Sequence, residues 1–256
     1  MGIFDTHAHL TDGRFDGDRH ELIESLKPSG VDLVLDVACD VRDVEGTLAL
    51  VEQYPFIYAA VGMHPHDAVH MRAEHLYAIE QYMRRDKVVA LGEIGLDYHY
   101  DFSPRDVQRR WFSEQLDLAV QLDVPVVLHI REAFGDCMDI LRGYKGRLRG
   151  EMHCFSGSVE TAFECVDMGL YVAFGGALTF KNARKLPDVA RLIPMERILI
   201  ETDCPYIAPE PLRGRRNDPT MAVYVAHKLA ELRDMSPAAV IEATKRNGME
   251  LFGIAE

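Results

Sequence analysis

The chain contains 256 residues, 48% of them hydrophobic, which is enough apolar material for one large core. Acidic residues outnumber basic ones by 41 to 28, and the net charge of −13 excludes a protein that wraps duplex DNA with a broad basic face. Five cysteines without a C-x-x-C spacing argue against a disulfide framework or a zinc knuckle. We find no signal-peptide pattern and no apolar run of the roughly 20 residues that a membrane span needs. We therefore expect a cytoplasmic location without membrane attachment.

Short apolar or β-branched runs predict eight strands, separated by segments with helical spacing. The strands are expected near residues 2–6, 31–38, 57–63, 88–94, 124–130, 150–155, 170–175 and 198–203. After the fourth strand, Ser103 is the predicted N-cap of a helix and Pro104 its first residue. The buried face of this helix is predicted to consist of Phe112, Leu116, Ala119 and Val120.

The last strand is followed by a loop rich in proline and arginine and then by two predicted helices. Met221, Val225, Leu229 and Leu232 form the expected core face of the first, and Ser236-Pro237 begins the second. Eight strands alternating with helices predict a (β/α)8 TIM barrel, as a single domain over residues 1–256. An open doubly wound sheet has the same alternation. It is too wide, however, to bring side chains from the first, fourth, fifth, sixth and eighth strands to one point.

Those five strands all end in residues that can bind a metal ion. The candidate ligands are His7, His9, Glu93, His129, His153 and Asp203. His7 and His9 are two residues apart and therefore point to the same face of a strand. This pair alone is weak evidence, because the chain contains a second such pair at His64-Pro65-His66. Buried polar groups need partners, and one shared cation satisfies all the strand ends together.

Four imidazoles and two carboxylates are too many ligands for one tetrahedral catalytic ion. They suit two divalent ions that share a bridging carboxylate and clamp the attacking and leaving oxygens of a displacement. We assign one ion to His7, His9, Glu93 and Asp203, and the other to Glu93, His129 and His153. The sequence leaves the metal open among Mg, Mn and Zn.

Six segments, in this order, resemble the motifs of the TatD family of metal-dependent deoxyribonucleases, which are amidohydrolase-like barrels. They are Asp5–Leu10, Gly62–His66, Gly92–Tyr98, His129–Ala133, His153–Gly157 and Glu201–Tyr206, and the similarity runs from residue 3 to about residue 252. The resemblance implies a TIM barrel, two divalent ions and hydrolysis of phosphodiester bonds in DNA, commonly from a 3′ end. It also implies the same six metal ligands. The family often has Tyr in place of His99 and Glu in place of Asp218, and both differences concern the substrate mouth.

Further residues at the strand ends have candidate roles in catalysis. Asp203 is expected to orient or deprotonate the attacking water, or to act as a ligand only. Glu201 either orients a ligand histidine or belongs to a buried salt bridge. His64 is a candidate for binding a phosphate oxygen or protonating the leaving oxygen, whereas His66 is expected in an exposed loop.

Three groups are candidates for holding the substrate. Arg131 either binds a phosphate or pairs with an acid such as Glu132. Arg213, Arg215 and Arg216 form the one dense basic cluster, which is either a clamp for the nucleic-acid backbone or a solvated surface. Tyr98 and His99 either stack on a base or pack within their loop. Cys154 and Cys204 are predicted to point away from the metal as small core residues.

The leading hypothesis is a two-metal nuclease that cleaves DNA from 3′ ends, on single strands or frayed ends. The alternative keeps the barrel and metals but hydrolyses a carboxylic ester, a lactone, an amide or an aminoacyl-tRNA. Related barrels of that kind often bridge their metals with a modified lysine on the fourth strand. This chain has Glu93 there, and Lys87 lies at the start of the strand. A non-catalytic scaffold fits poorly, since structural metal sites need fewer ligands. The oligomeric state is left open and is compatible with a monomer.

Overall fold

A computed structural model describes residues 2–42 and 44–255, so Met1, Asp43 and Glu256 of the predicted domain lie outside it. Eight parallel strands follow one another around a single sheet in chain order. They are β1 (Ile3–Ala8), β2 (Val31–Ala38), β3 (Ile57–Val61), β4 (Val88–Asp97), β5 (Val126–Arg131), β6 (Gly150–Met152), β7 (Leu170–Phe174) and β8 (Ile198–Ile200). The predicted (β/α)8 TIM barrel is confirmed.

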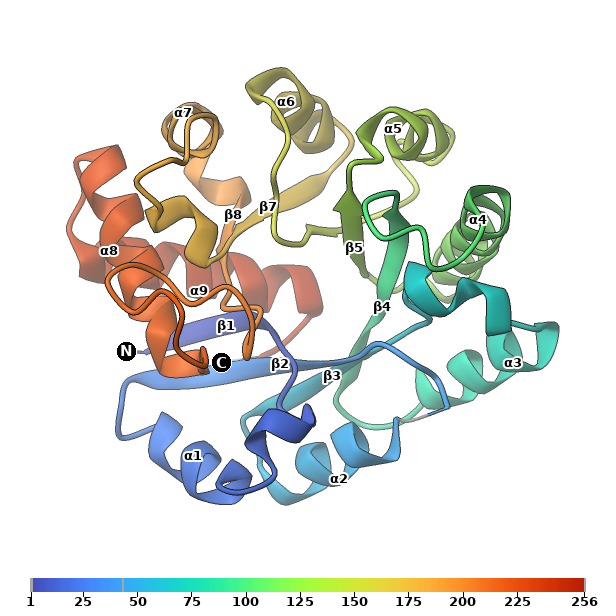
Figure 1. Ribbon diagram of the computed structural model, residues 1–256, viewed down its shortest axis with the longest axis horizontal. Coiled ribbons are helices and arrows are strands. Elements are labelled where there is room, and N and C mark those ends of the chain that lie inside the picture. Colours follow the sequence, from blue (N-terminus) through green and yellow to red (C-terminus); the bar gives the residue numbers. More distant parts are fainter. Residues whose placement is uncertain (1, 43, 256) are drawn as a thin grey trace.

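Helices surround the strands on the outside, as the view along the barrel shows (Figure 1). They are α1 (Arg19–Leu26), α2 (Glu45–Gln53), α3 (Ala73–Tyr82), α4 (Arg105–Leu122), α5 (Phe134–Arg142), α6 (Val159–Asp167), α7 (Leu186–Leu192), α8 (Ala222–Arg233) and α9 (Pro237–Phe252). Short 3-10 helices occur in several loops, including η2 (Pro65–His70) after β3 and η3 (Gly176–Thr179) after β7. Within the described part of the chain, no helix has both the length and the apolar character that crossing a membrane requires.

The barrel closes between β8 and β1 through hydrogen bonds beyond the end of β8. The amide of Asp203 donates to the carbonyl of His7 at 2.9 Å, and that of His9 donates to the carbonyl of Cys204 at 2.8 Å. Below them, the amide and hydroxyl of Thr202 bind the Asp5 carboxyl at 2.8 and 2.6 Å. These contacts bring the first and last strand ends together, which an open sheet does not do.

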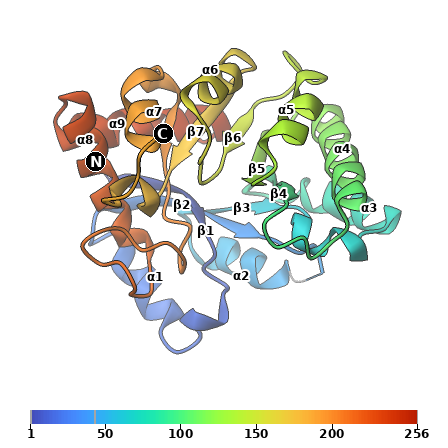
Figure 2. The same ribbon diagram turned by 45° about the horizontal axis from the view of Figure 1, so that its top comes forward.

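Helix α9 seals the end of the barrel opposite the strand C-termini. Leu251, Phe252 and Ile254 belong to one buried cluster with inward-facing strand residues such as Phe4 and Leu35. The rings of Phe4 and Phe252 meet edge to face at 5.9 Å. A second, larger cluster fills the layer between strands and outer helices. The interior is therefore packed, and the end at the strand C-termini is the one available for a site among the described residues. Figure 2 shows the strands within the ring of helices from a second direction.

Several predicted element ends differ from the structure. Strands β6 and β8 end at Met152 and Ile200, earlier than the predicted residues 155 and 203, because the chain turns out of the barrel there. Ser103 is not the N-cap of α4, which begins at Arg105. Its hydroxyl instead donates to the carbonyl of His66 at 2.8 Å and accepts from the amide of Val69 at 2.9 Å.

Candidate metal centre

The six predicted metal ligands meet at the C-terminal end of the barrel, with Glu93 of β4 at the centre. One oxygen of Glu93 lies 2.7 Å from Nδ1 of His129 and 3.7 Å from Nε2 of His153. The other oxygen lies 3.4 Å from Nε2 of His7 and 3.9 Å from Nε2 of His9. Asp203 completes the set, with Oδ1 at 3.4 Å from Nε2 of His9. Five distant parts of the chain thus contribute to one buried group.

In three of the four imidazoles, the ring nitrogen that points away from the centre contacts an oxygen acceptor. Nδ1 of His153 lies 2.9 Å from Oε2 of Glu201, and Nδ1 of His9 lies 3.0 Å from the carbonyl of Val37. Nε2 of His129 lies 3.2 Å from Oδ2 of Asp97. A ring nitrogen that donates outward leaves its partner nitrogen as an acceptor directed at the centre, which is the arrangement typical of metal-binding histidines.

The inward nitrogens fit a cation. Nε2 of His7 and Nε2 of His9 are only 3.2 Å apart, and two lone pairs so close need a proton or a metal between them. Donor atoms within 4.8 Å of one another form three groups at the centre. They are His7, His9 and Glu93; His64, Glu93 and His129; and His7, His153 and Asp203. Glu93 belongs to two groups, as a bridging ligand requires, whereas His153 groups with Asp203 rather than with His129.

Charge at the centre follows from burial and from these neighbours. Burial alone would raise the pKa of Glu93, but the imidazoles around it hold that pKa well below its usual value. Burial would lower the pKa of His153, but Glu201 and Glu93 raise it to about 10. An imidazole this basic carries a proton unless a cation takes its lone pair. The centre therefore prefers added positive charge, whether from protons or from metal ions.

Two residues at this site had no predicted role. Asp97 is fully buried at the end of β4, and Oδ2 accepts from Nε2 of both His129 and His66, at 3.2 and 2.8 Å. The thiol of Cys39, after β2, donates to Oε2 of Glu93 at 3.4 Å. The carboxylate of Asp97 was visible in the sequence directly after Leu96, at the end of the same strand. Nothing in the sequence around Cys39 marked it.

A layer of buried acids lies beneath the centre, inside the barrel. Asp5 and Glu151 are both fully buried, and burial raises the pKa of Asp5 to about 8. Burial beside Glu201 raises the pKa of Glu151 well above its ordinary value. The carboxyl oxygens of Glu151 and Glu201 lie within 4.8 Å of a ring nitrogen of His7. Of the two uses predicted for Glu201, the geometry favours orienting the histidine at position 153.

His64, the N-cap of η2, and His66, within η2, lie beside the centre. Nδ1 of His64 accepts from the amide of His66 at 3.1 Å, so Nε2, 3.7 Å from Glu93, carries the proton of the neutral ring. Burial, with His129 nearby, lowers the pKa of His64 well below its ordinary value. A neutral ring donates a hydrogen bond rather than a proton. The prediction of an exposed loop position for His66 is wrong, because its side chain is only 27% exposed and binds Asp97.

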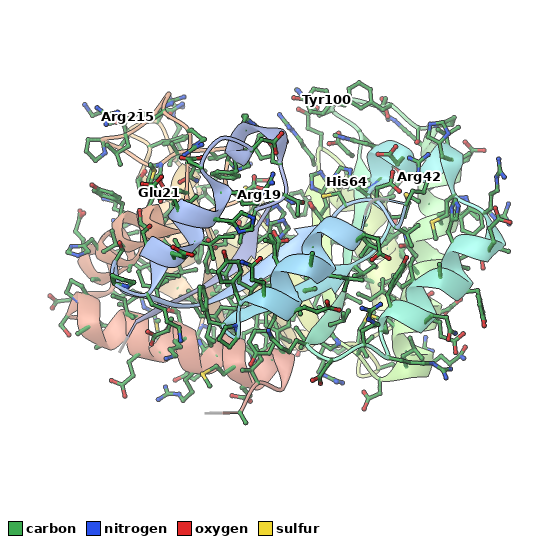
Figure 3. All side chains as sticks on the ribbon, turned by 90° about the horizontal axis from the view of Figure 1, so that it is seen from below. Arg19, Glu21, Arg42, His64, Tyr100 and Arg215 are labelled. Atoms are coloured by element: carbon green, nitrogen blue, oxygen red, sulfur yellow. The ribbon has the colours of Figure 1, made fainter. Side chains whose placement is uncertain are left out.

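The predicted basic residues lie around the rim with different partners. The guanidinium of Arg216 donates two hydrogen bonds to the carboxylate of Asp18, at 2.7 and 2.6 Å, and therefore has a structural role. Arg213 lies over the ring of Phe180 at 4.2 Å, and Arg215 is exposed at the upper edge of the molecule (Figure 3). Arg131 is exposed and lies over the ring of Tyr100 at 4.8 Å, instead of pairing with Glu132.

The two residues predicted to stack on a base are engaged elsewhere. The hydroxyl of Tyr98 donates to Asp136 at 2.6 Å, and the guanidinium of Arg105 lies 4.3 Å from the centre of its ring. Nδ1 of His99 lies 2.7 Å from Glu132. Their side chains thus make the loop packing that was the alternative.

The cysteine predictions are half right. Cys204 is fully buried in the core, as expected. Cys154 is partly exposed, and its sulfur lies within 4.8 Å of donor atoms of His153 and Glu201. The cause is its left-handed backbone, φ 43°, which breaks the strand alternation that the prediction assumed.

Comparison with known proteins agrees with this geometry. The model of the TatD related DNase family matches residues 4–253. The metal-dependent hydrolase YabD of Bacillus subtilis, which is uncharacterized, is 44% identical, over 98% of this chain and 99% of its own. The 3′-5′ ssDNA/RNA exonuclease TatD of Escherichia coli is 33% identical, over 99% of this chain and 100% of its own.

A solved structure gives the same result. The crystal structure of YjjV, a TatD homologue from Escherichia coli, superposes with a TM-score of 0.93 and 32% identity, covering 99% of this chain and 98% of that one. The family match spans nearly the whole chain and includes every strand end that meets at the centre. The chain therefore belongs to the TatD family and is a metal-dependent hydrolase.

Proposed function

We propose that this enzyme is a two-metal nuclease that removes nucleotides from the 3′ ends of single-stranded or frayed DNA. The observation that carries the proposal is the convergence of four imidazoles on Glu93 and Asp203. The name of the Escherichia coli relative, a 3′-5′ ssDNA/RNA exonuclease, supports the substrate class and the polarity, and it makes RNA a second substrate to test.

The ligands of the proposed ions are His7, His9, Glu93, His129, His153 and Asp203, with Glu93 shared. Divalent ions bound there supply Lewis acidity and lower the pKa of coordinated water. Mg, Mn and Zn are the candidate ions, and imidazole-rich sites favour Zn by affinity. The acceptors behind His9, His129 and His153 take the outward N–H of each ring, so that the inward nitrogen is the one that can bind a metal ion.

Asp203 and His64 have the proposed roles next to the scissile phosphate. The hydrogen bond to His9 and the surrounding imidazoles outweigh burial and lower the pKa of Asp203, so it is ionised and can accept the proton of the attacking water. Nε2–H of His64 donates to a phosphate oxygen. Arg131, Arg213 and Arg215 hold the phosphates on either side of the mouth.

The ester or lactone alternative has no comparable support. A lysine bridge is absent among the described residues of the centre, since Nζ of Lys87 binds the backbone carbonyls of Val51 and Tyr54 at 2.5 and 2.8 Å. Glu93 occupies the bridging position instead.

One assay separates the two functions. Protein stripped with a chelator and reloaded with Mg, Mn or Zn is offered 5′-labelled single-stranded DNA and RNA, beside a panel of lactones and esters. We expect a ladder shortened from the 3′ end, lost in Glu93→Ala and Asp203→Ala, with metal content reduced in Glu93→Ala. Turnover of esters without cleavage of nucleic acid would overturn the proposal.

A further inference from the structure

An exposed aromatic cluster lies beside the metal centre, on the loop between β4 and α4. Tyr100 is 47% exposed and Phe102 is 65% exposed, although both are large apolar side chains. Their rings stack, with centroids 5.1 Å apart and planes 18° apart. The guanidinium of Arg131 lies 4.8 Å from the centre of the Tyr100 ring, so a cation adjoins the stacked pair.

The cluster is connected to the metal centre through His66. The ring of His66 meets Tyr100 at 5.3 Å and Phe102 at 4.9 Å, in both cases edge to face. Nε2 of His66 binds Oδ2 of Asp97, and the same oxygen binds His129. One imidazole and one carboxylate thus separate the exposed rings from a proposed ligand. In Figure 3, Tyr100 lies at the upper edge with His64 below it.

The loop that presents the rings is fixed by hydrogen bonds before any ligand arrives. The amide of Tyr100 donates to Oδ1 of Asp97 at 2.9 Å. The side-chain amide of Gln108 donates to the carbonyls of Asp97 and Ser103 at 3.1 and 2.8 Å, and Ser103 is bonded to His66. Exposed aromatic rings on a braced loop form a preorganised surface.

We infer that Tyr100 and Phe102 form a stacking site for one unpaired base of the substrate strand, with the phosphate beside it held by Arg131. This inference rests on the proposed nuclease function. Arg131, Tyr100 and Phe102 already stack on one another in this order, and a base would stack on Phe102 next. Stacking grips single strands without sequence preference, because every base has a flat face. In a chain of net charge −13, such a contact supplies binding that the overall electrostatics do not.

The test uses wild-type enzyme and three variants on single-stranded oligonucleotides that carry one abasic residue at successive positions from the 3′ end. We expect the wild type to show about tenfold lower kcat/KM when the stacked base is missing. Phe102→Ala and Tyr100→Ala should raise KM about tenfold on the intact strand, keep kcat, and show no preference for the base. Phe102→Trp should restore the preference.

Tyr77→Ala is the matched control, because Tyr77 is 65% exposed on α3. It should keep wild-type KM. If the wild type cleaves the strand but Phe102→Ala has the same KM and the same preference for the base, the stacking inference is overturned. The nuclease function would still stand. A change of oligomeric state in the Phe102 and Tyr100 variants, seen by sedimentation without a change of KM, identifies a subunit contact and also overturns it. Absence of nucleic-acid cleavage by the wild type removes the proposed function and this inference together.

Discussion

Asp5 joins the first and last strands directly below the metal centre. Its carboxyl binds the amide and the hydroxyl of Thr202 and is fully buried. Burial raises its folded pKa from 3.8 to about 8. Below pH 4 the carboxyl is protonated in both the folded and unfolded states. Between pH 4 and 8 only the folded state keeps the proton, so stability falls as pH rises through this window.

Asp5→Asn should remove this pH dependence, since an amide copies the neutral carboxyl and keeps both contacts with Thr202. In chelated protein, the free energy of unfolding of the wild type should fall between pH 5 and 8 more steeply than that of the variant, by up to about 1.4 kcal/mol per pH unit. Urea unfolding at four pH values measures both slopes.

Asp32→Asn is the control for this experiment. Hydrogen bonds from Lys245 and the Gly2 amide outweigh burial and lower the pKa of Asp32, so its contribution is lost only as pH falls below the ordinary aspartate range. Its slope between pH 5 and 8 should therefore match that of the wild type. Equal slopes for wild type and Asp5→Asn would show that Asp5 is ionised in the folded protein.

At the residue scale, the sequence allowed prediction of those side chains whose direction follows from strand alternation. His7, His9, Glu93 and His129 lie on strands or immediately after them, and they converge as expected. Cys154 lies where the backbone turns left-handed, so alternation gave its direction wrongly. The candidates for base stacking were Tyr98 and His99, with loop packing as the alternative. Loop packing holds, because distant acids bind both side chains: Asp136 accepts a hydrogen bond from Tyr98, and Glu132 contacts His99.

At the scale of elements, the pairing of β4 with β5 leaves no room for a side chain at Gly95. A Cβ on Gly95 would lie 1.9 Å from the carbonyl oxygen of His129, and its φ of +149° is rare for other residues. The pairing of Gly95 with His129 therefore sets how near Glu93, the proposed bridging ligand, lies to the histidine of β5.

Gly95→Ala should force β5 away from β4 and displace His129. We expect a loss of about 3 kcal/mol or more in the free energy of unfolding, together with weakened metal binding. Thermal unfolding and metal content measure both. Gly135→Ala in α5 is the matched control: its Cβ meets nothing within 4 Å, and better helix propensity should stabilise it by up to about 1 kcal/mol. A Tm for Gly95→Ala within about 2 °C of wild type would contradict the argument.

Element order was predictable because alternating strands and helices leave few topologies. The residues at which the elements begin and end were less predictable. Ser103 has the residue type of an N-cap and precedes a proline, yet its hydroxyl binds η2, where the carbonyl of His66 and the amide of Val69 need partners. The tertiary hydrogen bonds of Ser103 therefore outweighed its local preference for an N-cap position, and no neighbouring residue in the sequence indicates those bonds.

At the scale of the whole molecule, a net charge of −13 limits nucleic-acid binding to the few cations at the mouth. Each phosphate neutralised on a single strand contributes about −0.7 to the slope of log affinity against log salt. Replacing both Arg213 and Arg215 by Gln should make the slope of log kcat/KM against log KCl shallower by about 1.4. Exonuclease assays between low and moderate salt measure it.

The control for this prediction is the double change Arg84→Gln and Arg85→Gln. It alters the net charge equally but lies just before β4, at the opposite end of the barrel, where Arg84 pairs with Glu80 and Arg85 with Glu52. Its slope should equal that of the wild type. Equal slopes in both double variants would mean that Arg213 and Arg215 touch no phosphate.

Leu251 and Phe252 of α9, with Ile254 just after the helix, close the end of the barrel opposite the metal centre. A nucleic-acid strand cannot pass through that end, so in the proposed reaction each released nucleotide must leave by the opening through which the strand entered. A site that is open on one side only accommodates a chain terminus more easily than an internal stretch, whose two arms must both turn back at the rim. The position of α9, at the end of the barrel opposite the metal centre, thus favours cleavage that begins at the ends of a strand.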